Sequence, residues 1–167
     1  MKIKSILLIA LSALLLFSLV ACTGDGADTT APDGSTDTPF TPDLSALRDK
    51  MIADFEATDA INIETDMLLN LYGIAAADVA ECAAYMTMDG VFPQEVIMIK
   101  ATDADAAARV EAALNNRIAE VKTQSQNYDP ENYALAQKCK VAVRDTYVTM
   151  FLSPHFDDMT ALFNGTK

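Results

Sequence analysis

Tryptophan is absent from this 167-residue chain, which has one histidine, six glycines and only 12 basic residues. None of the glycines forms a GxGxxG or another phosphate-binding loop, and the motifs HExxH, GxSxG and CxxC are also missing. These absences exclude the common signatures of dinucleotide-binding proteins, zinc proteases, serine hydrolases and dithiol enzymes. The sequence therefore predicts no catalytic residue, no metal ligand and no cofactor.

Basic residues are outnumbered by 24 acidic ones, so the formal net charge is −12. Nucleic-acid binding needs Lys and Arg to neutralise phosphates, and this composition does not supply them. The same deficit argues against a polybasic contact with anionic lipid headgroups. We expect no nucleic-acid partner and interpret the acidic surface as a source of solubility.

A hydrophobic run near the N-terminus predicts targeting to the membrane. Lys2 and Lys4 precede the largely apolar run Ile6–Leu16, a pattern typical of a secretory signal and too short for a comfortable bilayer span. Leu19-Val20-Ala21-Cys22 resembles the bacterial lipobox, in which the cysteine sulfur receives a diacylglyceryl group and becomes the new N-terminus. The sequence thus predicts a signal peptide over residues 1–21 and a lipid anchor at Cys22. Two acyl chains hold a protein stably on a membrane, here the extracytoplasmic face of the cell membrane.

Residues 22–43 are predicted to be a flexible acidic linker. Thr, Gly, Asp, Ala, Pro and Ser dominate the segment, which has five aspartates and no basic residue. Such a composition has too little apolar surface to offset the entropy of ordering. Residues 44–167 are long enough for a single domain with its own core.

Two further cysteines, Cys82 and Cys139, lie in the predicted domain. A disulfide between them is chemically permitted outside the cytoplasm, whereas two buried thiols would behave as small apolar residues. We favour the free thiols and keep the disulfide as the alternative.

Hydrophobic periodicity predicts helices and strands in alternation through this domain. Helices are expected from Asp43 to Phe55, from Glu64 to Tyr72, from Asp103 to about Gln126, in a short segment from Pro130, and from Asp157 to Phe163. Strands are expected over residues 81–88, 95–101, 139–144 and 147–152. The predicted fold class is α+β, with a small antiparallel sheet of about four strands and helices packed on one face. The main elements follow the order α-α-β-β-α-β-β-α.

Several of these segments carry a family resemblance. Leu71-Tyr72-Gly73-Ile74, Asp78-Val79, Tyr85-Met86 and Glu95–Ala101 resemble a family of small bacterial lipoproteins. Its members contain a domain of unknown function and occur mainly in Gram-positive bacteria. The resemblance implies a surface lipoprotein with an α+β domain, and it carries over no catalytic residue.

Two sets of side chains were considered as sites. Ser153, His155 and Asp157 contain the residue types of a nucleophilic triad, but they lie in one short segment, whereas triads assemble from separated ones. Exposed tyrosines favour recognition, and the candidates for such a surface are Tyr85, Tyr128, Tyr133 and Tyr147. The alternative, which we favour for each of them, is packing at the edge of the core.

The leading hypothesis is a membrane-anchored extracytoplasmic lipoprotein that binds a protein or small molecule without catalysing a reaction. The alternative is a small cell-envelope hydrolase that uses acidic residues. A cleft with two converging carboxylates would favour the hydrolase, and an open contact surface would favour binding.

Overall fold

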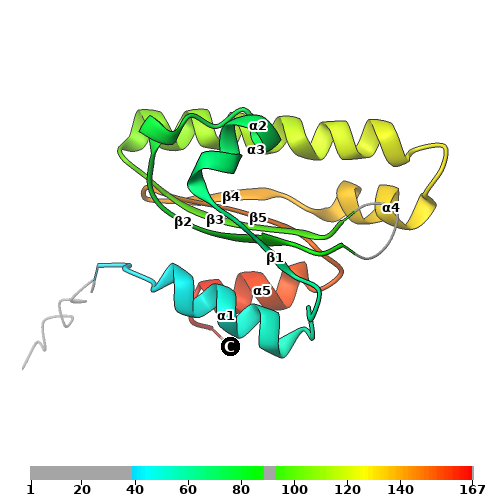
Figure 1. Ribbon diagram of the computed structural model, residues 1–167, viewed down its shortest axis with the longest axis horizontal. Helices are drawn as coiled ribbons and strands as arrows, with labels where there is room; N and C mark the ends of the chain where they lie inside the picture. Colours follow the sequence, from blue (N-terminus) through cyan, green and yellow to red (C-terminus); the bar gives the residue numbers. More distant parts are fainter. Residues whose placement is uncertain (1–38, 89–92, 167) are drawn as a thin grey trace, which may run out of the picture. The chain divides into compact units, whose positions relative to one another are not determined.

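The computed structural model describes residues 39–88 and 93–166, which lie in one compact unit. The predicted leader, Cys22 and most of the predicted linker lie outside the described residues. The unit contains a five-stranded sheet between two layers of helices (Figure 1). The helices are α1 (Leu44–Asp54), α2 (Leu68–Tyr72), α3 (Ala104–Ser125), α4 (Pro130–Lys138) and α5 (Phe156–Phe163). The strands are β1 (Ile61–Ile63), β2 (Val79–Met86), β3 (Glu95–Ala101), β4 (Val141–Arg144) and β5 (Tyr147–Leu152).

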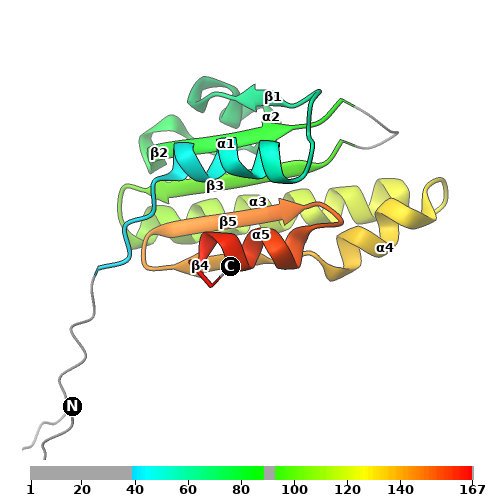
Figure 2. The ribbon, with the colours of Figure 1, turned by 90° about the horizontal axis from the view of Figure 1, so that it is seen from below.

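The sheet has the order β1-β2-β3-β5-β4, and every neighbouring pair is antiparallel. β3 is the central strand, and β1 and β4 form the two edges, which Figure 2 shows on opposite sides of the sheet. Four antiparallel steps separate β1 from β4. The two edge strands therefore run in the same direction.

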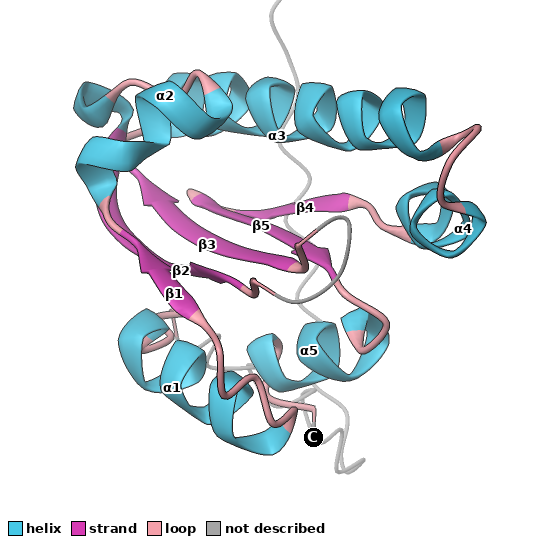
Figure 3. Ribbon diagram, turned by 45° about the vertical axis from the view of Figure 1, so that its right-hand side comes forward, coloured by secondary structure: helices cyan, strands magenta, loops and turns pink. Residues whose placement is uncertain are grey.

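Both faces of the sheet are covered, and alternate residues of β3 explain why. Ile97 and Ile99 point into a core shared with α2, α3 and α4, whereas Val96 and Met98 point into a second core formed with α1 and α5. Figure 3 shows the sheet between these two helical layers. The α+β class with an antiparallel sheet is confirmed, but the expectation of helices on one face is wrong. A strand with consecutive apolar residues buries both of its sides.

Aspartates and glycines set several helix ends where the sequence predicts them. The side chains of Asp43, Asp103 and Asp129 each accept a hydrogen bond from the backbone N–H three residues later. These bonds satisfy free N–H groups at the starts of α1, α3 and α4. Gly73 ends α2 with a φ of +71°, a left-handed conformation that glycine adopts without steric cost.

The structure also corrects the predicted element list. β1 is a fifth strand, which raises the number from about four. The short helix expected from Pro130 is present as α4, which has nine residues and lies between α3 and β4. The last helix is expected to start at Asp157, but α5 begins at Phe156 with His155 at its N-cap position. Asp157 therefore lies in the first turn of the helix. There its negative charge interacts favourably with the positive end of the helix dipole.

Candidate functional site

Ser153, His155 and Asp157 do not assemble into a triad, as their placement in one short segment predicts. The Ser153 hydroxyl is buried and donates a hydrogen bond to Oε1 of Gln94 at 2.8 Å, while it accepts one from the His155 backbone N–H at 3.2 Å. The His155 imidazole instead stacks on Phe55, with ring centroids 4.8 Å apart. The Ser153 hydroxyl thus links the segment after β5 to Gln94, the residue before β3. Among the described residues, no hydrogen bond joins this hydroxyl to the His155 imidazole.

The four candidate tyrosines separate into core and surface residues. Tyr85 and Tyr147 are buried in the core beneath α1 and α5, and burial raises the pKa of Tyr85 to about 12. Tyr128 is 85% exposed and Tyr133 is half-buried. The four therefore do not form one recognition surface.

Cys82 and Cys139 are free thiols in the structure. Cys82 lies on β2, and Cys139 precedes β4 on the far side of β3 and β5. Three strand spacings of about 4.8 Å separate those positions, well beyond the Cα separation that a disulfide allows. Burial raises the pKa of both thiols, that of Cys82 to about 11.

A buried ion pair joins β3 to α3. Glu95 is fully buried, and the guanidinium of Arg117 donates from Nε to both carboxylate oxygens at 3.1 Å. The hydroxyl of Tyr72 lies nearby and is buried, and it makes no hydrogen bond with any of the described residues. Burial and the negative charge of Glu95 raise the pKa of that hydroxyl. Sequence reasoning missed this cluster, since its members come from three separate elements.

A cleft of about 350 Å³ lies between α1 and α5. Asp54 and Asp158 both line it, together with Lys50, Phe55 and Leu162. Asp54 is already engaged by Lys50 at 2.8 Å, in an exposed ion pair one helical turn apart. The cleft thus brings together two carboxylates from opposite ends of the domain sequence.

A second concave surface runs beside β4. The groove between α3, α4 and β4 has a volume of about 420 Å³, and Asn115, Lys122, Gln137 and Lys140 line it together with one acid, Glu111. Among the described residues, no segment pairs with the outer side of β4. Alternate residues of an edge strand direct their N–H and C=O groups away from the sheet. β4 therefore offers backbone hydrogen-bonding groups next to a polar groove.

Within the part of the chain that the structure describes, cations without a carboxylate partner gather at this edge. Of the nine Lys and Arg residues that the structure describes, Arg48, Lys50, Arg109 and Arg117 form ion pairs. The others are Lys100, whose ammonium stacks on Tyr147, and four residues on or bordering β4, namely Lys122, Lys138, Lys140 and Arg144. Asp145 and Asp157 also lie in this region, so the edge is locally basic rather than uniformly positive.

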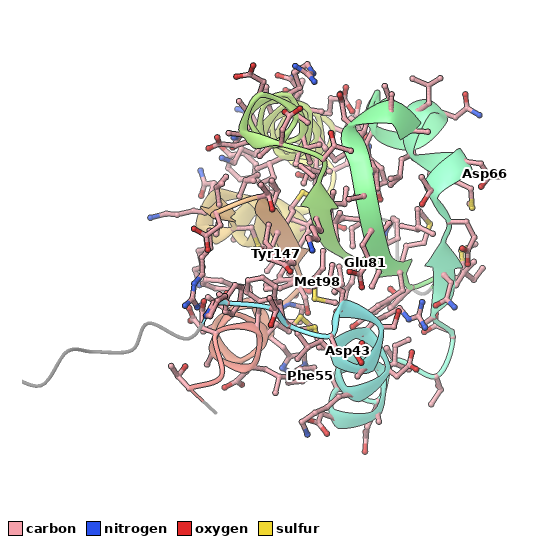
Figure 4. All side chains as sticks on the ribbon, turned by 90° about the vertical axis from the view of Figure 1, so that its left-hand side faces the viewer. Asp43, Phe55, Asp66, Glu81, Met98 and Tyr147 are labelled. Atoms are coloured by element: carbon pink, nitrogen blue, oxygen red, sulfur yellow. The ribbon has the colours of Figure 1, made fainter. Side chains whose placement is uncertain are left out.

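The β1 edge has the opposite character. Asp59, Glu64 and Asp66 flank β1, and all three are exposed. Figure 4 shows Asp66 on the outer side of this edge, away from Tyr147 near the other edge. Ile61 at the β1 edge is 47% exposed, and Val143 at the β4 edge is 43% exposed. Each edge thus combines an exposed aliphatic residue with charges of one predominant sign.

Residues 39–88 and 93–166 contain neither a metal-binding cluster nor a membrane-spanning helix. No cluster of three or more His, Cys, Asp or Glu side chains could hold a metal ion there. No helix in that part of the chain is long and apolar enough to cross a membrane.

Comparison with known proteins gives one match. Residues 53–153 match a family model described as "Domain of unknown function (DUF4358)". The matched region contains the whole sheet and leaves out most of α1 and all of α5. No curated protein and no solved structure matches the chain. The expected domain of unknown function is thereby confirmed, while the lipoprotein character and the Gram-positive source stay predictions.

Proposed function

The chain belongs to the DUF4358 family, and we propose that it is a lipid-anchored extracytoplasmic binding module whose contact surface is the β4 edge with its adjoining groove. The proposal has two separable parts: the anchor at Cys22, and the binding surface on the domain.

The anchor is supported by the sequence alone. The charged start, the hydrophobic run and the lipobox-like residues before Cys22 occur in the order that lipoprotein processing requires. The acidic, Gly- and Pro-containing segment that follows suits a tether between membrane and domain.

The binding surface is supported by the coverage of the sheet. Helices bury both faces, so the sheet can contact a partner only at its edges. β4 is the longer edge strand, and Ala142, Val143 and Arg144 are exposed along it. An uncovered edge that accepts an extended segment is a recurrent mode of recognition, because backbone hydrogen bonds supply affinity and flanking side chains supply specificity. This uncovered edge is the observation that carries the proposal.

The anchor can be tested by mass spectrometry of the N-terminal peptide from the membrane fraction. We expect a diacylglyceryl group on Cys22 and no residue before it. In the Cys22→Ser variant, the uncleaved chain should accumulate. An unmodified Cys22 in the mature protein would contradict the anchor.

The binding surface can be tested by photo-crosslinking in intact cells. A photoreactive residue is placed at Ala142 on β4 or, as a control, at Ala112 on the exposed side of α3. We expect a discrete crosslinked product from position 142 and none from position 112. Equal products, or none, would remove β4 as the contact surface.

The hydrolase alternative has one observation in its favour, the α1–α5 cleft lined by Asp54 and Asp158. Release of soluble fragments from purified cell-wall material by the wild-type protein, lost in Asp54→Asn, would support it. The ion pair of Asp54 with Lys50 argues for a structural role, since the carboxylate already has a cationic partner.

A further inference from the structure

We propose that the partner of the β4 edge is the β1 edge of a second copy of this chain, so that copies associate head to tail through a continuous sheet. The inference rests on the proposed β4 surface and names its occupant. It draws on the proposed anchor only for the confinement of copies on one surface.

The directions of the edge strands permit this arrangement. Because β1 and β4 run the same way, a second copy displaced sideways, without turning over, places its β1 parallel to β4 of the first. Both helical layers then continue on their own sides of the joined sheet. Asn62 and Ala142, the exposed residues near the centres of the two strands, both lie on the α1 and α5 side, opposite Tyr85 and Thr149 respectively.

The charges at the two edges are complementary in that register. With Asn62 beside Ala142, Glu64 lies beside Arg144, and Ala60 lies beside Lys140, one residue along the chain from Asp59. Glu64 and Lys140 have no other ion pair among the described residues, and Asp59 accepts one hydrogen bond, from the backbone N–H of Met88 at 2.7 Å. Opposite charges at an interface favour the correct partner and register.

The same charges disfavour the simplest competing pair. Antiparallel pairing of two β4 strands centred on Ala142 would place Lys140 of one copy against Arg144 of the other. Like charges directly opposite each other destabilise a strand pair. The acidic linker of the chain is also a poor occupant, because its prolines cannot donate to a ladder.

The contact is small, since it joins a strand of three residues to one of four. Interfaces well below about 1,200 Å² form weak or transient complexes. Confinement of many copies on one surface raises their effective concentration and favours such a contact. A head-to-tail contact does not use up both edges, so it produces chains of copies rather than closed dimers.

Cysteine crosslinking of the full chain in its native membranes tests the arrangement. The variant Asn62→Cys/Ala142→Cys places one thiol at each edge, at a strand spacing compatible with a disulfide. Under a mild oxidant we expect a ladder of dimers, trimers and larger species on a non-reducing gel. A variant with only one of the two substitutions keeps the native thiols Cys82 and Cys139, which are half-buried and buried, and should give at most a dimer. A double variant that gives no species above the dimer would overturn the proposal.

A charge exchange in the double-cysteine background provides the matched control. Arg144→Glu and Glu64→Arg should each reduce the ladder several-fold, and the two combined in one chain should restore it, because each edge then carries the opposite charge. Lys50→Glu, with the same change in net charge as Arg144→Glu but located on α1, should leave the ladder unchanged. Failure of the combined variant to restore the ladder would overturn the charge complementarity.

Photo-crosslinking at Ala142 separates this inference from the proposed function. A product that contains two copies of the chain supports both. A product with a different protein keeps the β4 surface and overturns the second copy as its occupant. Absence of any product overturns both.

Discussion

The guanidinium of Arg117 on α3 holds the fully buried carboxylate of Glu95 on β3. The pair lies on the side of the sheet that α2, α3 and α4 cover, and it links the central strand to the longest helix. Arg117 also approaches Glu120 at 3.5 Å, near the surface. The arrangement leads to testable predictions about stability.

Removal of one member of the Glu95–Arg117 pair should lower the stability more than removal of both. Arg117→Leu leaves a buried, unpaired carboxylate and should lower the free energy of unfolding by about 3–5 kcal/mol. Glu95→Leu/Arg117→Leu replaces the pair with apolar side chains and should recover much of that loss. Urea denaturation of the three proteins gives the comparison. A double variant less stable than Arg117→Leu would contradict the prediction.

Tyr72 contributes a buried hydroxyl that makes no hydrogen bond within residues 39–88 and 93–166. Tyr72→Phe removes that group and keeps the ring, so the free energy of unfolding should stay within about 0.5 kcal/mol of the wild-type value or rise. A loss of more than about 1.5 kcal/mol would indicate that the hydroxyl donates a hydrogen bond to Glu95 in solution.

Substitution of Ser153 should lower the stability of the fold more than substitution of His155. Ser153→Ala leaves Gln94 Oε1 and a backbone N–H without their partner and should cost about 1–3 kcal/mol of stability. The exposed His155 ring contributes mainly its stacking on Phe55, so His155→Ala should cost less. Thermal or urea unfolding gives the order, and a larger effect of His155→Ala would contradict it.

The Cys82 thiol should ionise only at high pH. Its pKa is raised from 9.0 to about 11, chiefly by burial and then by the charge of Glu64. The neutral thiol is thus favoured in the folded chain, so its stabilising contribution is complete below pH 9 and is lost as the pH rises toward 11. Peptide-level mass spectrometry should show the alkylation rate of Cys82 rising by roughly ninefold between pH 9 and 10, whereas an unshifted thiol would rise by less than about twofold. A rise of about twofold or less over that interval would contradict the shift.

Local signals in the sequence predicted much of the fold. β3 was predicted with its observed bounds, and Asp43, Asp103 and Gly73 lie at the expected helix ends. These features depend on neighbouring residues alone. The same holds for the run of strand-favouring residues that predicts β5 over residues 147–152.

Features that depend on distant partners were missed. β1 has three residues, and it is recognisable as a strand only through its pairing with β2. The second helical layer was also missed, although the uninterrupted apolar run Val96–Ile99 is typical of a strand covered on both sides. The Glu95–Arg117 pair and the contrast between the two edges need the sheet order, which periodicity does not provide.

Phe40 fastens the start of the described domain to its C-terminal helix. Its ring lies against Tyr147 and Phe163, and the Arg144 guanidinium stacks on it at 3.6 Å. If the chain is tethered through its N-terminal segment, as proposed, tension from that side would reach this aromatic cluster before α1 or the three-residue strand β1. The contacts of Phe40 would then shield the short edge strand from traction.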